Sequence, residues 1–525
     1  MLRELAFNLL GVFLPVTAIV AFATPLLGKA RKRAPWALAM FAALFVAVTT
    51  TVVYAAVAVG GRPLVYPFGG WPPPIGIMYE VDAFNGVLGL LTGWVILAIT
   101  AYSKWYEKEM DEPVWYYTLL VGLMVGLLGC LYTGDAFNLF VMIEVLSISA
   151  YGLVAYHKQR PEAVEAASKY ALIGAVATNM YFLALVVIYG NYSTLNMADL
   201  ALVGRAYAAS PLPALLAVSF SLWVFTYKAA VFPNHFWLPD AHPEAPTPVS
   251  AALSGLVVNI GVYAVARFLY TIFGYNNALG LYRGAVLLAL LLLGCASALL
   301  GAFMMLVQRD IKRLLAYSTV SHIGLALMAG SLGFAAAGGA LVLALTAMVA
   351  HLVSHSISKA TLFMASGVFI HEAGSRDLDA MRGLGRVRPL SAIAMTLSFL
   401  NLAGFIPFVG FFSKLLMYQA FLDAGLPVLA FVVILVSAVS LLGYMKPIYS
   451  IAFSFKKGAP VTSPRVELVD VLLVAMSASL LVLGLVLGLS PGVFSQPALS
   501  LTQQGVEDYI RAYLETRKSL GGPYG

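Results

Sequence analysis

Cysteine is nearly absent from this sequence. The 525 residues include only Cys130 and Cys295, and each lies within an apolar run. Two cysteines are too few for a disulfide framework, and two thiols alone do not ligate an iron–sulfur cluster. We expect both to be small, buried, apolar residues.

Charge is also scarce. Only 10% of the residues are charged and 61% are hydrophobic, whereas a soluble chain has about 25% charged and about 45–50% apolar residues. The composition therefore predicts a membrane protein. The net charge of +7 does not indicate nucleic-acid binding, because the basic residues lie in short loops between apolar runs, where they set membrane topology.

Motifs for nucleotides and electrons are missing too. The sequence contains no Walker loop, dinucleotide fingerprint, cysteine cluster or metalloprotease motif. We expect no cofactor in this chain and no redox or catalytic centre of its own. Uphill transport would need an ion gradient or partner subunits as its energy source.

Long apolar runs fill most of the chain. A bilayer core of ~30 Å needs about 20 apolar residues per helix, which predicts an all-α polytopic membrane protein with about fourteen transmembrane helices. The basic cluster of Lys29, Arg31, Lys32 and Arg33 follows the first run, which is reversed for a signal peptide. The runs are 5–27, 35–59, 81–102, 114–133, 135–156, 163–190, 213–238, 247–273, 284–307, 311–333, 337–370, 389–421, 426–453 and 467–490.

The basic residues concentrate in alternate loops. With the N-terminus outside, the outside loops hold only Arg62, Arg205 and Arg283. This bias predicts a cytoplasmic membrane protein with its N-terminus outside. The inside loops then hold Lys29, Arg31, Lys32, Arg33, Lys104, Lys108, Lys158, Arg160, Arg309, Lys312, Arg313, Arg376, Arg382, Arg386, Arg388, Lys456, Lys457 and Arg465.

Two apolar segments contain helix breakers. The seventh has Pro233 and Pro239, and the twelfth has Gly404, Pro407 and Gly410. Segments 4–8 and 9–13 each number five, so the second set runs opposite to the first. Broken helices at matching places in two inverted repeats indicate a transport path between the repeats.

The segments divide the chain into four predicted parts. Residues 1–113 hold the first three helices, 114–273 the first five-helix bundle, 284–453 the second, inverted bundle, and 454–525 the last helix with a polar tail. Within the tail, residues 506–518 could form a short helix that contacts a partner or stays solvated.

Ionisable residues interrupt the apolar segments. Each one near the bilayer centre costs at least ~2.5–3.5 kcal/mol, so a set spread over several segments favours a relay that moves protons or ions over simple packing. These residues are Glu144, Lys169, Lys228, His322, His351, His355, Lys359 and Lys414.

Glu144 is expected to pair with a lysine. Lys228, beside the seventh-segment break, is the first candidate, and a carboxylate whose pKa depends on a nearby lysine would gate proton uptake. The alternative is a static ion pair between two helices. Lys169 is the next partner, unless it lies near the inner surface with its ammonium group reaching water.

His351, His355 and Lys359 are spaced by four residues and so share one face of segment eleven. With His322 from segment ten they form a line of titratable groups. A zinc site and satisfied buried histidines are the alternatives. Lys359 in the same stripe disfavours a bound cation, and we expect no metal.

Further residues are candidates for the ends of the relay, and His235, Asp240 and His242 are the candidates for proton entry. Asp240, His242 and Glu244 lie within the proline-rich stretch 239–248, which we expect to be an inner-surface loop that guides protons in, docks a partner or is solvated. Arg267 is expected to reach the outer interface. Lys446 is a candidate for the final relay position.

Several motifs together resemble the antiporter-like proton-translocating subunits of Complex I, of energy-converting hydrogenases and of Mrp-type cation/proton antiporters. The resemblance covers about residues 70–455; residues 69–76 followed by Asp82 are similar to the Mrp D-type and hydrogenase branch. The motifs are Asn138 to Glu144, Tyr227 to Val231, His235 to His242, Pro246 to Ala251, Asp310 to Ser318, His351 to Lys359 and Phe411 to Lys414.

The resemblance implies fourteen core helices, two inverted bundles and a polar midplane chain. It implies that Glu144 and Lys228 are the fifth- and seventh-helix pair, that His322, His351, His355 and Lys359 connect the centre, and that Lys414 is the exit-side lysine. One position departs from the pattern, because Asn259 stands where the family often has a lysine. Asparagine cannot hold a proton at neutral pH.

The favoured function is a proton-translocating subunit of a redox-driven pump, hydrogenase-like or Complex I-like. Its expected partners are other membrane subunits, among them redox subunits with metal centres, and protons, with sodium as an option. An Mrp-type sodium/proton antiporter subunit is the close alternative. A non-conducting scaffold, which only Asn259 supports, and a stand-alone solute carrier are the others.

Overall fold

The computed structural model describes residues 1–31, 33–203, 211–275, 278–280, 282–454 and 463–521. Four residues of the loop-charge prediction, Lys32, Arg205, Lys456 and Lys457, lie outside the described residues.

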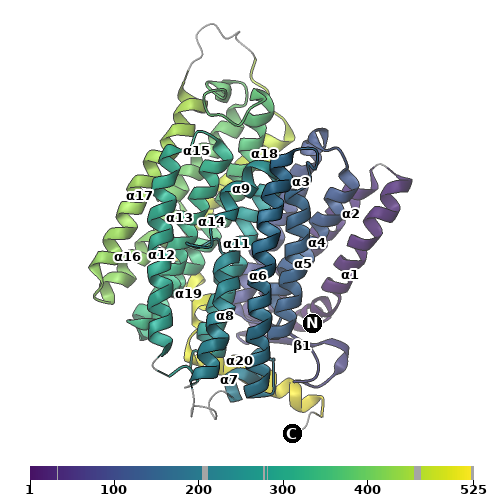
Figure 1. Ribbon diagram of the computed structural model, residues 1–525, viewed down its shortest axis with the longest axis vertical. Helices are drawn as coiled ribbons and strands as arrows, with labels where there is room; N and C mark the ends of the chain where they lie inside the picture. Colours follow the sequence, from purple (N-terminus) through teal and green to yellow (C-terminus); the bar gives the residue numbers. More distant parts are fainter. Residues whose placement is uncertain (32, 204–210, 276–277, 281, 455–462, 522–525) are drawn as a thin grey trace.

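The described chain is almost entirely helical (Figure 1). Helices suit apolar segments in a bilayer because they satisfy every backbone hydrogen bond internally. The α-helices are α1 (Leu2–Ala30), α2 (Ala34–Gly60), α3 (Ala83–Tyr106), α4 (Pro113–Tyr132), α5 (Ala136–Val154), α6 (Pro161–Tyr192), α7 (Met197–Val203), α8 (Leu212–Lys228), α9 (Trp237–Glu244), α10 (Thr247–Ala252), α11 (Val258–Ala266), α12 (Tyr282–Val307), α13 (Ile311–Gly330), α14 (Gly338–Ala373), α15 (Pro389–Ala403), α16 (Val409–Asp423), α17 (Pro427–Ile448), α18 (Leu468–Leu489), α19 (Gly492–Leu499) and α20 (Gln503–Ser519).

Short elements complete the fold. Three π-helical stretches, η3 (Leu253–Val257), η4 (Arg267–Ile272) and η7 (Tyr449–Phe453), continue α10, α11 and α17. Strands β1 (Leu64–Pro67) and β2 (Met78–Val81) form an antiparallel hairpin that pairs Val65 with Glu80. The hairpin was not predicted, because its strands are too short for a periodic signal.

The predicted number of membrane segments is confirmed. Twelve helices within the described residues are long and apolar enough to span a bilayer. The seventh and twelfth segments are each built from two shorter helices, α8 with α9 and α15 with α16. α4 begins at the end where α12 finishes, so the two five-segment sets run in opposite directions. The four-part division of the chain remains a prediction.

Both predicted breaks are present. α8 stops at Lys228, Ala230 has a positive φ of 51°, and the helix resumes at Trp237. α15 stops at Ala403, Gly404 has a φ of 93°, and α16 begins at Val409. The stretch 239–248, predicted as a loop, is instead helical over most of its length, since α9 runs to Glu244 and α10 begins at Thr247. Prolines fit in the first turn of a helix, where the missing N–H has no partner to lose.

The two ends of the molecule differ in charge. One end, called the basic end here, carries the loops with Lys104, Lys158, Arg309, Arg376 and Arg388, and lies at the top of Figure 1. The opposite end carries the β1–β2 hairpin, α7, α20 and both termini (Figure 1).

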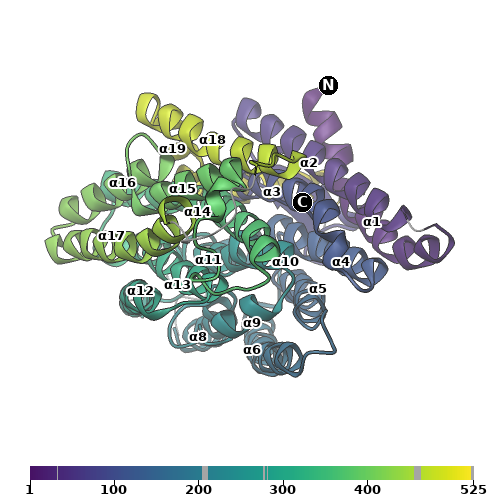
Figure 2. The same cartoon turned by 90° about the horizontal axis from the view of Figure 1, so that it is seen from above.

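The core is formed by central helices that carry polar residues. The segment Thr247–Ile272 and the segment Ile311–Phe334 are buried along the whole of their most apolar windows, and α14 is largely buried. Viewed along the bundle, α11, α13 and α14 lie near the middle, with α1, α6, α12 and α17 around them (Figure 2). Ionisable side chains in a membrane protein are tolerated in such positions because protein surrounds them.

Candidate functional site

Three histidines meet at the centre of the second bundle. His322 from α13 and His351 and His355 from α14 are at most 2% exposed. His322 Nδ1 lies 3.1 Å from His351 Nε2, and the two rings stack with their centroids 5.1 Å apart. The His355 ring is 6.1 Å from that of His322. The structure therefore brings together the residues that spacing along α14 predicted to share a face.

Uncharged hydroxyl groups extend this cluster. His322 Nε2 is 2.8 Å from the Tyr444 hydroxyl, which is 2.6 Å from Ser318 Oγ. His351 Nδ1 is 3.1 Å from Ser413 Oγ. The sequence analysis missed all three hydroxyl residues, because serine and tyrosine in an apolar run leave no charge signal.

Lys414 follows Ser413 on α16 and is almost fully buried, at 7% exposed. Its ammonium group donates to the carbonyls of Leu402 (2.7 Å) and Ala403 (3.2 Å). These carbonyls belong to the last turn of α15, where helix C-termini leave acceptors unpaired and carry partial negative charge. The break between α15 and α16 thus supplies the acceptors for a buried lysine.

Lys359 lies one helical turn beyond His355 on α14 and is fully buried. Its ammonium group donates to the Leu315 carbonyl of α13 at 3.1 Å. Both ring nitrogens of His355 are buried, and among the described residues neither has a hydrogen-bond partner.

Lys228 is the last residue of α8 and is 1% exposed. Its ammonium group donates to Ser147 Oγ of α5 at 2.6 Å. It also lies 5.4–5.5 Å from the ring centroids of Tyr151, Tyr170 and Tyr227, within the range of cation–π attraction.

The predicted ion pair between Glu144 and Lys228 is not formed. Ser147, almost one turn along α5 from Glu144, accepts a hydrogen bond from the Lys228 ammonium group instead. The Glu144 side chain is half-buried, and it belongs to none of the ion pairs found among the described residues. Side chains three positions apart lie on one helix face, so α5 presents both groups to the same region.

Lys169 lies apart from the buried groups. Its side chain is 48% exposed and pairs with Glu165 (2.7 Å) and Asp240 (3.3 Å). This placement matches the alternative in which the ammonium group of Lys169 lies near the surface.

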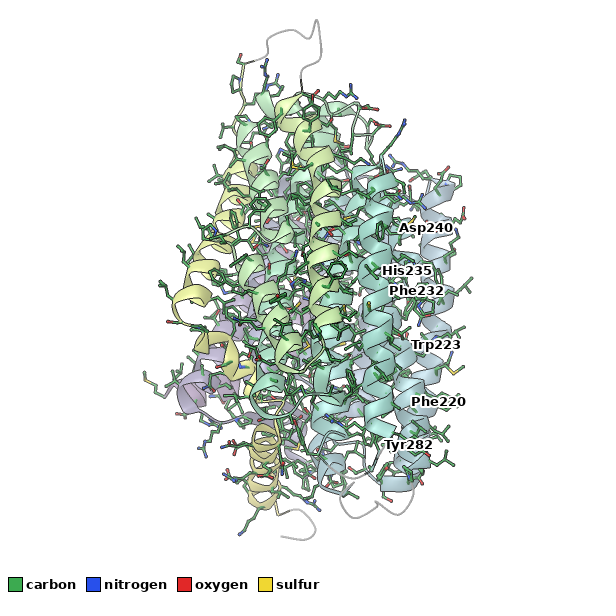
Figure 3. All side chains as sticks on the ribbon, turned by 90° about the vertical axis from the view of Figure 1, so that its left-hand side faces the viewer. Phe220, Trp223, Phe232, His235, Asp240 and Tyr282 are labelled. Atoms are coloured by element: carbon green, nitrogen blue, oxygen red, sulfur yellow. The ribbon has the colours of Figure 1, made fainter. Side chains whose placement is uncertain are left out.

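The three residues predicted for proton uptake are spread along the broken seventh segment. Figure 3 shows this segment from Phe220 and Trp223 up to His235 and Asp240, toward the basic end. Asp240 bridges Lys169 and Arg313 at the surface. His242 is fully buried on α9 and stacks on Phe363 with centroids 4.6 Å apart. Only Asp240 of the three lies at a charged surface.

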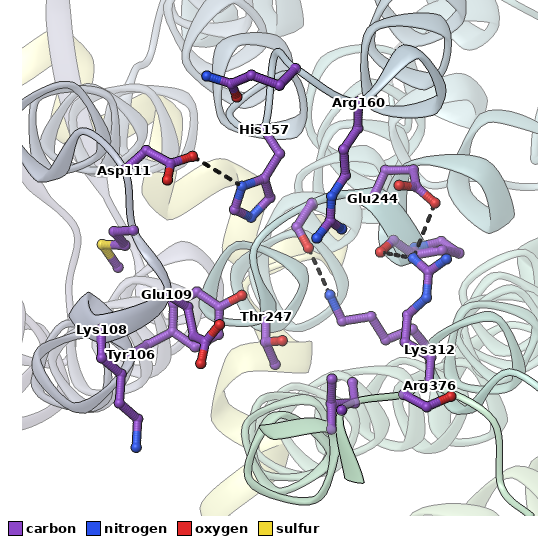
Figure 4. A pocket seen from close by; sticks show the side chains of 17 residues that line it. Tyr106, Lys108, Glu109, Asp111, His157, Arg160, Glu244, Thr247, Lys312 and Arg376 are labelled. Atoms are coloured by element: carbon purple, nitrogen blue, oxygen red, sulfur yellow. Dashed lines mark hydrogen bonds and ion pairs between the residues drawn. The ribbon is translucent and has the colours of Figure 1, made fainter. Parts of the chain in front are cut away.

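A polar depression of about 880 Å³ opens at the basic end (Figure 4). Lys312, which the loop-charge prediction counted as a loop residue, is buried in the first turn of α13 and donates to the Ala245 carbonyl at 2.7 Å. Lys359 bonds to the carbonyl of Leu315, three residues further along α13 than Lys312. Lys312, which lines the depression, is thus almost one turn of α13 away from the residue that Lys359 contacts.

The rim of the depression carries both signs of charge. Arg376 pairs with Glu244 at 3.0 Å, and His157 lies 3.9 Å from Asp111. Burial and the neighbouring Arg160 lower the pKa of His157, with Asp111 opposing them. His157 is therefore neutral at pH 7, because its ordinary pKa is already about 6.5.

Asn259 lies beside the row of His351, His355 and Lys359 on α14. Its amide donates to Ser356 Oγ (2.6 Å) and to the Gly255 carbonyl (3.1 Å). Ser356 lies between His355 and Lys359 on α14, so Asn259 joins the eighth segment to the helix that carries the stripe.

Two predictions for single basic residues are wrong. Arg267 does not reach the outer interface, because it is 1% exposed and paired with Asp82 at 2.6 Å. Lys446 donates to the carbonyls of Leu306 (2.9 Å) and Gln308 (2.5 Å) near the end of α12. Lys446 therefore lies at the basic end, and its ammonium group forms its hydrogen bonds outside the central histidine cluster.

Comparison with known proteins identifies relatives over most of the chain. A family model described as NADH:quinone oxidoreductase/Mrp antiporter, TM, matches residues 133–440. NADH-quinone oxidoreductase subunit N of Desulforudis audaxviator is 34% identical over 431 residues, covering 81% of this chain and 82% of that protein. The D-type subunit of the Na(+)/H(+) antiporter of Alkalihalophilus pseudofirmus is 31% identical over 383 residues, covering 73% and 74%.

Solved structures give the same result. A chain of the membrane-bound sulfane sulfur reductase, an archaeal respiratory membrane complex, superposes with a TM-score of 0.87 at 26% identity, covering 95% of this chain and 99% of that chain. A chain of the Mrp complex from Dietzia sp. DQ12-45-1b superposes with a TM-score of 0.84 at 26% identity, covering 96% and 99%.

Proposed function

Because the chain belongs to the NADH:quinone oxidoreductase/Mrp antiporter transmembrane family, we propose that it is the proton-translocating, antiporter-like subunit of a redox-driven membrane complex. The observation that carries this proposal is the buried series of polar contacts from Tyr444 through His322 and His351 to Ser413, next to Lys414. It crosses four membrane segments where packing alone would favour apolar side chains.

The chemistry of imidazole suits this arrangement. A neutral histidine has one nitrogen that donates and one that accepts, so a proton taken up on one side is released from the other. His351 has a ring on one side (His322) and a hydroxyl on the other (Ser413). A proton moving along this series reaches the residue beside Lys414, which exchanges it at the α15–α16 break.

Lys228 and Lys359 act upstream in this proposal. The depression at the basic end, which Lys312 lines, supplies protons from that side. Lys228 is the buried lysine of the first bundle and is held by Ser147 and three tyrosine rings. Glu144, three residues from Ser147 on the same face of α5, is the carboxylate that would pair with Lys228 within the first bundle.

A redox-driven complex is favoured over a secondary antiporter. Support comes from the respiratory complex with a TM-score of 0.87 and the 34% identical oxidoreductase subunit. In this setting the partner subunits hold the metal centres, and this chain needs no cofactor. The second candidate, a D-type subunit of an Mrp sodium/proton antiporter, is favoured by the relatives at 31% identity and a TM-score of 0.84.

Extraction from native membranes in mild detergent, followed by identification of the co-purifying subunits, separates these two candidates. Subunits with iron–sulfur or nickel–iron centres are the expected result. Only small hydrophobic partners without redox centres would overturn the redox setting and favour the antiporter.

Conduction is tested in the intact complex, reconstituted in proteoliposomes with a pH-sensitive dye. We expect Lys414→Ala and Lys228→Ala each to reduce coupled proton movement by about tenfold or more, since each removes a buried titratable group. Lys446→Ala is the matched control, because it removes a lysine that lies outside the cluster, and it should leave proton movement unchanged. Wild-type rates in both test variants, with the complex assembled, would identify a non-conducting scaffold.

A further inference from the structure

Glu80 is a buried carboxyl group at the opposite end, away from the central histidine cluster. It lies on β2 and is 0% exposed. Among the described residues, neither of its carboxyl oxygens has a hydrogen-bond partner. The Tyr509 hydroxyl of α20 faces the Glu80 carboxyl, and both lie against Gly134, where an added Cβ would be 3.2 Å from Glu80 Cβ and 3.4 Å from that hydroxyl.

The neighbouring cation already has a counter-ion. Arg267 pairs with Asp82 at 2.6 Å, and both side chains are at most 4% exposed. Asp82 also accepts from the backbone N–H groups of Phe84 and Asn85 at the start of α3, where it caps the helix. Arg267 is further enclosed by the rings of Phe84, Tyr263 and Tyr509.

The groups around Glu80 lack a positive charge that could neutralise a second carboxylate besides Asp82. The titratable and charged groups that face it are Asp82 from the start of α3, Arg267 from η4 and Tyr509 from α20, with Tyr263 of α11 beside Arg267. The single positive charge of Arg267 can neutralise only one of the two carboxylates, so the other has no counter-ion. A buried carboxyl without a partner takes up a proton, because the charged form is heavily penalised. Burial raises the pKa of Glu80 well above its ordinary value and Asp82 adds to this rise, while Arg267 and the Tyr509 hydroxyl offset it only in part.

α20 covers the cluster. Its buried face includes Val506, Tyr509, Ile510 and Tyr513, while Glu515 on its exposed side reaches Arg62 beside the hairpin at 3.8 Å. Figure 1 shows α20 next to β1 and α7 at the end that carries both termini. The Glu80 carboxyl is fully buried, and the Tyr509 hydroxyl of α20 faces it.

We propose that Glu80 is a proton-binding site at the opposite end of the molecule, and that α20 is the cover that must open for its proton to exchange with water. On opening, the O–H bond of the neutral carboxyl breaks, the proton goes to water, and the carboxylate is hydrated. The site is separate from the His322–Lys414 series and does not depend on the proposed conduction through it.

The raised pKa of Glu80 determines how the stability of the closed state depends on pH. The closed state binds a proton that the open state releases near the ordinary carboxyl pKa. Closure is therefore favoured at low pH and weakens as the pH rises from about 4.5 toward the raised pKa of the closed site. Tyr509 stays neutral in this range, because burial also raises its pKa.

Infrared difference spectroscopy on the full chain in its complex tests the site directly. The wild type should show the band of a protonated carboxyl at pH 7, and Glu80→Gln should lose it. Glu515→Gln is the matched control, since this exposed carboxylate of α20 should leave the band unchanged. A band that persists in Glu80→Gln would overturn the assignment.

A second variant separates charge balance from folding. Asp82→Asn keeps a residue that can cap α3 but removes the counter-ion of Arg267. Glu80 should then ionise, so the band should disappear although Glu80 is still present. Retention of the band would contradict the charge balance on which the site rests.

Hydrogen exchange of residues 503–519 tests the cover. In the wild type, the protection of α20, corrected for the intrinsic pH effect, should fall as the pH rises above about 4.5. Glu80→Gln, which mimics the protonated form, should keep its protection across the same range. Equal pH dependence in the two proteins would refute the role of α20.

Discussion

At the scale of single residues, neutral hydroxyl groups connect the ionisable ones. Ser147 accepts a hydrogen bond from Lys228. Ser413, the residue next to Lys414, contacts His351, and Tyr444 lies between His322 and Ser318. A hydroxyl both donates and accepts, and its burial costs far less than that of a charge. Such groups can therefore extend a proton path through apolar segments without adding charges to it.

Tyr444→Phe should weaken this path without loss of assembly. The change removes only the hydroxyl, which contacts His322 at 2.8 Å and Ser318 at 2.6 Å. Loss of buried hydrogen bonds costs about 1–1.5 kcal/mol, so we expect proton movement in proteoliposomes to fall about tenfold. Tyr449→Phe, at an exposed position on the same segment, is the control and should behave as wild type. Unchanged transport in Tyr444→Phe would exclude this hydroxyl from the path.

At the scale of elements, the two broken segments use their breaks differently. The break after α8 places Lys228 at the last residue of the half-helix, where tyrosine rings and Ser147 surround it. The break after α15 leaves Lys414 on the second half-helix and offers it the carbonyl ends of the first. Both arrangements keep a lysine buried beside non-helical backbone, where polar backbone groups are free to interact with it.

Gly404→Ala tests the second break. Gly404 has a φ of 93°, and an added Cβ would lie 3.2 Å from Lys414 Cδ. Strain should cost about 1–3 kcal/mol of stability, and the methyl group should move the Lys414 ammonium group off its carbonyls. We therefore expect both a lower unfolding temperature and reduced proton movement.

Gly425→Ala is the matched control for strain alone. Gly425 has a φ of 72°, and nothing lies within 4 Å of an added Cβ. It should lower the unfolding temperature to a similar degree but leave proton movement intact. Equal loss of transport in both variants would assign the effect to strain and not to Lys414.

At the scale of the whole molecule, the two ends differ in charge and in cover. The basic end opens into a polar depression of about 880 Å³, while the opposite end carries the hairpin and α20, with smaller depressions of about 460 and 480 Å³ beside them. The positive-inside rule predicts that the basic end faces the cytoplasm. We therefore propose that both termini, the hairpin and α20 face the outside of the cytoplasmic membrane.

Cysteine labelling tests this orientation. In a Cys295→Ser background, Glu515→Cys and Lys158→Cys place thiols at exposed positions on opposite ends, 61% and 62% exposed in the native side chains. A membrane-impermeant maleimide added to intact cells should label position 515 and not position 158. Position 158 should react only after permeabilisation, and its labelling on intact cells would reverse the orientation.

Much of the fold could be predicted from the sequence. The segment count, both breaks and the shared face of His351, His355 and Lys359 depend on local patterns of hydropathy and spacing. The Glu144–Lys228 pair was wrong, because which residue of that face of α5 contacts Lys228 depends on how α5 and α8 are positioned along each other. Arg267 was misplaced because its cover, α20, is distant in sequence.

The sequence by itself determined that the chain crosses a membrane many times, and which loops share a side. Both follow from transfer free energies that add residue by residue along a short window. The tertiary structure alone decided that His322 meets Tyr444, 122 residues away, and that Arg267, Glu80 and Tyr509 close one cluster. Such contacts depend on how remote helices pack against each other, and no local pattern in the sequence encodes that packing.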